Sequence, residues 1–220
     1  MNATRTTPYA GTTSHGLGGA RTARLTPLAV VGAPALMALY GGIRLLPGSR
    51  EPGPGWTTGH AAMFAGLLLF APLLLALRRL LAPGGTTAGR FAAGAALGTA
   101  VTGLACSLTQ IGIDLVVGLT AADGAEQSRM FDRVQDVPGV LPAVYQVGPL
   151  LFHVGLLALL TAAAAGRSRA LRWWSPVLVL LGTLASGADL AFVPVAAACY
   201  LLALAPLARP AGAPGAVVPA

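Results

Sequence analysis

The apolar stretch that decides the fold runs from residue 59 to residue 77 and reads GHAAMFAGLLLFAPLLLAL. It contains no Asp, Glu, Lys or Arg, and Arg78 and Arg79 follow it directly. Its apolar residues form a continuous run, without the period of 3.6 that leaves a surface helix one polar face. A run of this length matches a hydrocarbon layer roughly 30 Å thick. We therefore predict a membrane-spanning helix that ends at the two arginines.

The composition of the whole chain agrees with a membrane protein. Of the 220 residues, 55% are hydrophobic and only 10% are charged, and the mean hydropathy is +0.72. Soluble domains average about a quarter charged residues because they need a solvated surface around the core. This chain has too few polar residues to cover itself, so we predict an all-α integral membrane protein.

Further apolar blocks predict the remaining spans. Three lie at Leu25–Ile43, Phe91–Leu115 and Val140–Ala165. A last apolar region, Ser175–Leu207, would measure about 50 Å as one helix, which exceeds the bilayer core. A break in the sequence SGADLAFVP divides it into Ser175–Ala188 and Leu190–Leu207, because Gly, Asp and Pro weaken a helix there. The predicted fold is a polytopic bundle of about six transmembrane helices, with five as the alternative.

The arginines predict how the bundle is oriented. The chain has no Lys, and all 14 of its basic residues are Arg. With six spans, ten of them fall on the side of the two termini and four on the other side. Since cytoplasmic loops carry the excess of basic residues, both termini are expected to be cytoplasmic and the loop 120–138 to lie outside. The net charge of +7 then reflects topology and an affinity for anionic lipid headgroups, without a nucleic-acid partner.

The domain organisation follows from the same blocks. Residues 25–207 are expected to form a single transmembrane domain, flanked by a disordered cytoplasmic segment, 1–24, and a disordered tail, 208–220, that is rich in Pro, Gly and Ala. The use of Arg alone, with abundant Ala, Gly and Pro, is typical of a GC-rich bacterial genome. The expected location is therefore the plasma (inner) membrane of a bacterium.

The outer loop carries a helix signature. Asp123 and Glu126 have the spacing of a capping box, and an apolar stripe follows at Met130, Phe131, Val134 and Val137. We predict a short amphipathic helix on the outer surface, acting as a connector and surface anchor or as a lid over a polar cavity. Nearby, Trp56 is expected in the outer aromatic belt.

Polar residues interrupt the apolar block Phe91–Leu115. Ser107, Gln110 and Asp114 are three and four residues apart, so they share one face of the predicted helix. A carboxylate facing hydrocarbon costs a few kcal/mol even on lenient insertion scales, so this stripe is expected to face the bundle interior. The alternative for Asp114 is that its side chain reaches interfacial water.

Other polar residues fall in the same, outer half of the membrane. The helix Val140–Ala165 brings Tyr145, Gln146 and His153, while His60 opens the second span and Asp189 sits at the proposed last turn. We expect Gln110, Asp114, Gln146 and His153 to line one cavity that opens toward the outer leaflet. The predicted ligand-binding residues are Ser107, Gln110, Asp114, Tyr145, Gln146 and His153, and the candidate catalytic residues are Asp114, His153, Asp189 and His60.

Three classes of function fit this pattern. The cavity binds a small amphiphilic or lipid-like molecule, as in a permease, a resistance factor or an accessory subunit. Alternatively, its carboxylate and imidazole groups act as acid and base in a membrane enzyme (an isomerase, cyclase or hydrolase) that acts on an isoprenoid or lipid. In the third class, His60 and His153 are axial ligands of a haem. We expect no metal site and no cofactor, because the sequence lacks zinc-ligand spacing, a P-loop and a dinucleotide glycine pattern.

Gly94 and Gly98 form a small-residue motif at the start of the block Phe91–Leu115. Small residues on one face let membrane helices approach closely. The motif predicts a helix packed in the centre of the bundle, or alternatively a face for a homo-oligomer.

Overall fold

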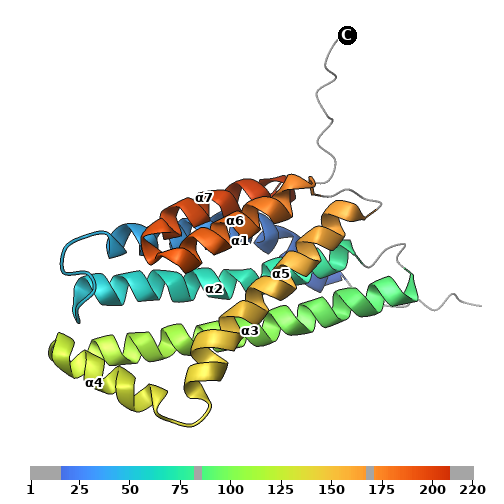
Figure 1. The fold of residues 1–220 in the computed structure, drawn as a ribbon. Coiled ribbons are helices and arrows are strands. Elements are labelled where there is room, and N and C mark those ends of the chain that lie inside the picture. Colours follow the sequence, from blue (N-terminus) through green and yellow to red (C-terminus); the bar gives the residue numbers. More distant parts are fainter. Residues whose placement is uncertain (1–15, 82–85, 167–170, 209–220) are drawn as a thin grey trace, which may run out of the picture.

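A computed structural model describes residues 16–81, 86–166 and 171–208 of the chain (Figure 1). The ordered elements in these ranges are all helical, which confirms the all-α prediction. The helices are α1 (Gly16–Arg44), α2 (Pro54–Leu80), α3 (Thr87–Thr120), α4 (Gly124–Gln135), the π-helical turn η1 (Leu141–Val147), α5 (Gly148–Ala165), α6 (Trp174–Ala188), the 3₁₀ turn η2 (Leu190–Phe192), α7 (Val193–Leu204) and the 3₁₀ turn η3 (Ala205–Ala208). The helix α1 begins before the expected Leu25, inside the segment 1–24. Residues 1–15 and 209–220, where disorder was predicted, lie outside the described residues.

Five helical segments are long and apolar enough to cross a membrane. They are Pro27–Arg44, Pro54–Leu80, Thr87–Thr120, Leu141–Ala165 and Leu190–Ala208. Many large apolar side chains on their outer faces are exposed, among them Leu68, Val116 and Leu202, as expected for surfaces that contact lipid. The chain is therefore a multi-pass membrane protein. The helix α6 is also apolar but has only 15 residues.

The last apolar region forms a helical hairpin, with its break at the predicted position. The Asp189 carboxylate accepts a hydrogen bond of 2.8 Å from the Ala191 amide, and this cap ends α6 and starts η2. The two arms then pack together, because Thr183 on α6 and Tyr200 on α7 share a hydrogen bond of 2.7 Å. The chain therefore turns back at Asp189 instead of continuing as one long helix.

The bundle core is built by α2, α5 and the hairpin around one aromatic cluster. Phe70 of α2 makes edge-to-face contacts with Phe152 of α5 and Tyr200 of α7, at centroid distances of 5.1 and 6.1 Å. In lipid the hydrophobic effect does not hold helices together, so close packing and side-chain hydrogen bonds carry their association. The fully buried residues around this cluster, which include Leu74, Leu156 and Leu159, supply that packing.

Glycines set the closest helix contact, which joins α3 and α5. A Cβ atom at Gly103 would overlap the backbone at Phe152, and one at Gly155 would overlap the backbone of α3 at Ala100. Gly94 and Gly98 have no neighbouring atom within 4 Å. The prediction that these two pack in the bundle centre is wrong, since the close contact is made by Gly103, further along α3, and by Gly155 of α5.

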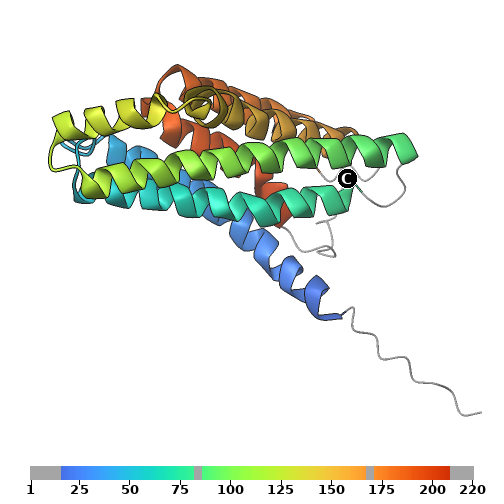
Figure 2. The same ribbon diagram turned by 90° about the horizontal axis from the view of Figure 1, so that it is seen from below.

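The predicted amphipathic helix is present as α4, which folds back against the end of α3 (Figure 2). Its capping box is confirmed, because the Asp123 carboxylate accepts a 2.7 Å bond from the Glu126 amide. The Glu126 carboxylate in turn accepts one of 2.8 Å from the Ala122 amide. The reciprocal pair satisfies amides that the first turn of a helix leaves free. It thereby fixes where α4 begins.

Candidate functional site

The helix α4 lies at one end of the bundle, which we call the α4 end (Figure 1). Here α1 finishes, α2 starts, and α3 passes into α4. Antiparallel order thus brings together Tyr40, His60 and Asp114 from three different helices.

Asp114 faces the interior of the bundle. Asp114 is 9% exposed, and its carboxylate contacts two side chains from other helices. The Tyr145 hydroxyl donates to Oδ1 at 3.3 Å, and His60 Nε2 lies 3.9 Å from Oδ2. The position of Asp114 therefore agrees with an inward-facing polar group and not with a side chain that reaches interfacial water.

The imidazole of His60 is held in a defined orientation. Its Nδ1 lies 2.8 Å from the carbonyl oxygen of Trp56, one helical turn earlier. A carbonyl only accepts hydrogen bonds, so Nδ1 is the nitrogen that carries a proton. The ring stacks on the indole of Trp56 at 4.0 Å and meets the edge of Tyr40 at 5.3 Å. These contacts aim Nε2 at Asp114.

Trp56 of α2 contacts both α3 and α4. Its indole Nε1 donates a 2.8 Å hydrogen bond to the backbone carbonyl of Asp114. The indole also lies directly against Gly118, where a Cβ atom would overlap it. The ring of Phe131 on α4 lies 6.0 Å from the indole, centroid to centroid. Trp56 is thus buried among α2, α3 and α4, and its place at the depth of the outer membrane interface stays a prediction.

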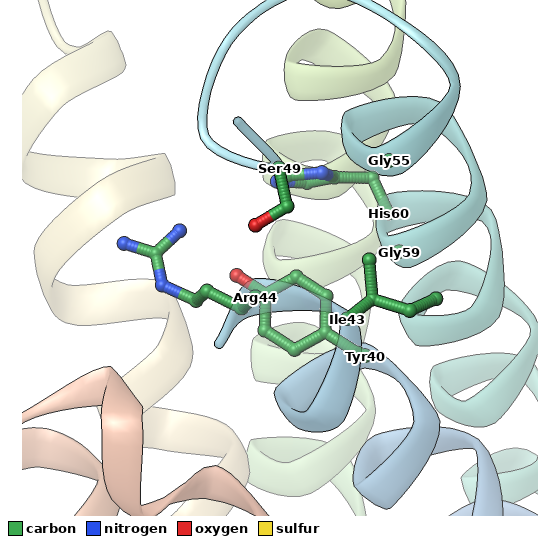
Figure 3. Close-up of a pocket in the computed structure, with 7 residues that line it drawn as sticks. All are labelled: Tyr40, Ile43, Arg44, Ser49, Gly55, Gly59 and His60. Atoms are coloured by element: carbon green, nitrogen blue, oxygen red, sulfur yellow. The ribbon is translucent and has the colours of Figure 1, made fainter. Parts of the chain in front are cut away.

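A small pocket adjoins His60, and its residues are drawn in Figure 3. Its volume is about 10 Å³, which is roughly the space that one water molecule needs. The hydroxyls of Ser49 and Tyr40 turn toward the side where the Arg44 guanidinium lies (Figure 3). The Nε of Arg44 is buried and has no hydrogen-bond partner in the described part of the chain. The pocket is therefore lined by two hydroxyls and a cationic side chain.

A larger cavity of about 150 Å³ lies one turn of α3 further into the bundle. Ser107, Gln110 and His153 line it together with Ser186 and Tyr200 of the hairpin. The rest of its wall is apolar and consists of Met37, Met63, Leu67, Phe70, Ile111, Phe152, Leu190 and Val193. His153 Nδ1 lies 2.7 Å from the Pro149 carbonyl, so this nitrogen donates and Nε2 is left to accept a hydrogen bond. The cavity is an apolar space with a few polar groups, as small-molecule sites are.

The structure divides the expected single site into two. Ser107, Gln110 and His153 share the larger cavity, whereas Asp114, Tyr145 and His60 form a separate cluster, which we call the Asp114 cluster.

Two of the expected site residues belong to neither group. Gln146 is exposed on η1, whose π-helical winding rotates it away from Asp114. Asp189 is exposed and caps the turn between α6 and α7. Neither therefore supports a role in a buried site.

Three residues beside the Asp114 cluster were not predicted from the sequence as site residues. Tyr40 and Arg44 are four residues apart near the end of α1, and Trp56 precedes His60 by the same interval on α2. This spacing places each pair on one helix face and was the available signal. In the sequence, Arg44 is one of the four arginines on the side opposite the termini, and Trp56 is predicted as an interfacial residue.

The residues present give little support to a metal centre. Among the described residues, no group of three or more His, Cys, Asp or Glu side chains is placed to hold a metal ion. Comparisons of the chain with protein families, with curated proteins and with solved structures found no match.

Proposed function

We propose that this protein binds a small amphiphilic molecule in the larger cavity between α1, α2, α3, α5 and the α6–α7 hairpin. The observation that carries the proposal is the composition of the wall, in which a mostly apolar surface surrounds a few polar groups. Such walls bury the apolar body of a ligand and use the polar groups to orient it.

The cavity volume limits the ligand. About 150 Å³ is small beside the several hundred Å³ of sites for drug-sized molecules, and a dry apolar cavity of about this size holds a benzene ring. The ligand is therefore a small molecule of that order, or the cavity takes one end of a longer isoprenoid or acyl chain. Two methionines in the wall, Met37 and Met63, are suited to irregular apolar shapes because their side chains adapt easily.

The polar groups indicate what the ligand presents. Gln110 and Ser107 each both donate and accept hydrogen bonds, and His153 Nε2 accepts. A hydroxyl or amide on the ligand would satisfy them, whereas an unpartnered polar group in this interior costs about 1–3 kcal/mol. The proposed ligand class is thus an uncharged amphiphile with one hydrogen-bonding group.

The proposal includes an orientation in the plasma membrane of a bacterium. We infer six crossings, with both termini cytoplasmic and α4 outside, because the hairpin gives an even number of helices and the arginines favour the side of the termini. In that orientation the cavity lies toward the outer leaflet. Membrane lipids are the expected partners of the exposed apolar faces.

Binding is better supported than the two alternatives. An enzyme that uses an acid and a base needs both groups beside one substrate. Asp114 and His153 belong to different sites, and the pocket at His60 has space for only about one water. A haem needs two histidines that face one iron, whereas His60 faces Asp114 and His153 lines the other cavity.

A cavity-filling substitution tests the proposal. The full-length protein is placed in lipid nanodiscs, and the thermal stabilisation by phenol, benzyl alcohol and short prenyl alcohols is measured. We expect concentration-dependent stabilisation by at least one of these probes, because a ligand that binds only the folded state raises its stability. Ile111→Trp fills the cavity and should abolish the effect.

Ile113→Trp is the matched control, because Ile113 lies on the same helix but outside the cavity wall. It should keep the stabilisation of the parent protein. Equal stabilisation of both variants by every active probe would mean that the probes act on the lipid or the surface, and the proposal would fall.

A further inference from the structure

The geometry between His60 and Asp114 leaves a proton unaccounted for. Nδ1 of His60 uses its proton toward the Trp56 carbonyl, so in a neutral imidazole Nε2 is a bare lone pair. That lone pair lies 3.9 Å from a carboxylate oxygen, which is also an acceptor. Two acceptors that face each other in a buried site repel, and one proton between them converts the repulsion into attraction.

Burial strengthens this argument. Both side chains are almost fully enclosed, at 5% exposure for His60 and 13% for Asp114. Without the extra proton the pair carries one negative charge, and with it the pair is neutral overall. Taking an uncompensated charge out of water costs several kcal/mol, so the interior favours the protonated pair.

We propose that His60 and Asp114 together form a proton-binding site, which takes up one proton from water and shares it between imidazole Nε2 and carboxylate Oδ2. The site is separate from the larger cavity and does not depend on the function proposed for that cavity. The Tyr145 hydroxyl completes it, since its 3.3 Å hydrogen bond to Oδ1 leaves Oδ2 free for the proton.

The surrounding groups supply a route for the proton. The pocket beside His60 has the volume of about one water and reaches Ser49 in the loop between α1 and α2. A water held there by the hydroxyl of Ser49 or Tyr40 would lie next to the imidazole. A proton passes from this water to the pair when the site fills, and back to water when it empties.

Arg44 provides the opposing charge that makes release feasible. The charged or titratable groups that surround His60 in the described residues are Tyr40 and Arg44 from α1, Asp114 from α3 and Tyr145 from η1, while α4 contributes Phe131 through Trp56. When the proton leaves, the guanidinium is the cation available to offset the Asp114 carboxylate. The proton and Arg44 thus act as alternative partners for one negative charge.

Nitrogen NMR of histidine tests the proposal directly. The full-length protein is labelled with ¹⁵N-histidine in nanodiscs, and the three signals are assigned with His15→Gln and His153→Gln. A protonated ring nitrogen and a lone-pair nitrogen have distinct chemical shifts. We expect His60 to show protonated Nδ1 at all pH values and, near neutral pH, an Nε2 that is protonated or hydrogen-bonded to a protonated carboxyl, with one proton lost as the pH is raised.

Asp114→Asn is the decisive variant, because it keeps the shape and removes the charge. The amide of Asn donates to Nε2, so His60 should become the plain Nδ1–H tautomer near neutral pH, with no proton lost on raising the pH further. Asp189→Asn is the control, since it removes an exposed carboxylate at the hairpin turn and leaves the pair and its neighbours in place. It should keep the proton.

Infrared spectra of the carboxyl region separate the two places where the proton resides. A protonated carboxyl band that disappears in Asp114→Asn supports the site just as a protonated Nε2 does. If Asp114→Asn does not fold, the parent protein still decides the matter through its own pH series. A parent protein with bare Nε2 and ionised Asp114 near neutral pH overturns the proposal.

Discussion

Replacing Gly118 with Ala tests whether Trp56 organises the α4 end. Helix α3 has no side chain at this position, and the indole of Trp56 occupies the space. An added methyl group has to displace the ring, yet the ring is held by His60 on one face, by Phe131 nearby and by its bond to the Asp114 carbonyl. We therefore expect Gly118→Ala to destabilise the protein, although Ala favours a helix.

The size of the effect follows from the contacts at risk. Losing the indole hydrogen bond costs about 0.5–1.5 kcal/mol, and losing the aromatic stacking costs about as much again. The gain in helix propensity offsets about 0.5–1 kcal/mol. The net expectation is a loss of about 0–2.5 kcal/mol in the free energy of unfolding, which overlaps the range of other overpacked interiors.

Gly112→Ala is the matched control on the same helix. Gly112 has no neighbouring atom within 4 Å, so its new methyl group meets open space. This variant should be neutral or stabilised by up to about 1 kcal/mol.

Thermal unfolding in detergent compares the two variants, and a protein of this size shifts by roughly 2–4 °C per kcal/mol. Trp56 fluorescence, read in a Trp173→Phe and Trp174→Phe background, reports the ring itself. Equal stability of the two variants with an unchanged Trp56 spectrum would refute the reasoning.

Two further predictions concern the membrane and the assembly. Topology reporters fused after Gly124 and after Arg209 should report opposite sides of the membrane, and signals from the same side would refute the six-crossing arrangement. The open face at Gly94 and Gly98 is proposed to contact a second copy of the chain, so Gly98→Cys should give disulfide-linked dimers in membranes, while Val116→Cys, exposed further along α3, should give far fewer. Equal crosslinking at both positions would argue against a specific interface.

The helices could be predicted from the sequence because each is indicated by residues close together in the chain. Continuous apolar runs mark the spans, the spacing of Asp123 and Glu126 marks α4, and Asp189 with Pro194 marks the turn of the hairpin. Each depends on residues within a few positions of one another, and the structure confirms each of these elements.

The candidate site could be predicted only in part from the sequence. Which side chains meet depends on how each helix is rotated about its axis relative to its neighbours. The face shared by Ser107, Gln110 and Asp114 was predicted, but a single helix face does not reveal which neighbour covers each turn. The π-helical turn η1 shifted the register before α5, so that Tyr145 and not Gln146 reaches Asp114. Gly103 and Gly155 also draw α3 onto α5 in a way that side-chain patterns do not encode.

The short length of α6 has a consequence for the surrounding bilayer. Its 15 residues extend about 22 Å, whereas the hydrocarbon core is roughly 30 Å thick. In the proposed six-crossing arrangement, the bilayer would therefore thin on the α6 side of the hairpin tip, where the exposed Asp189 lies. In that arrangement the Asp189 carboxylate would draw water and headgroups toward Ser186 and Leu190, which are wall residues of the larger cavity. The membrane itself would then be dimpled next to the hairpin, and a lipid-dissolved ligand would meet the protein at a point where the apolar layer is thinnest.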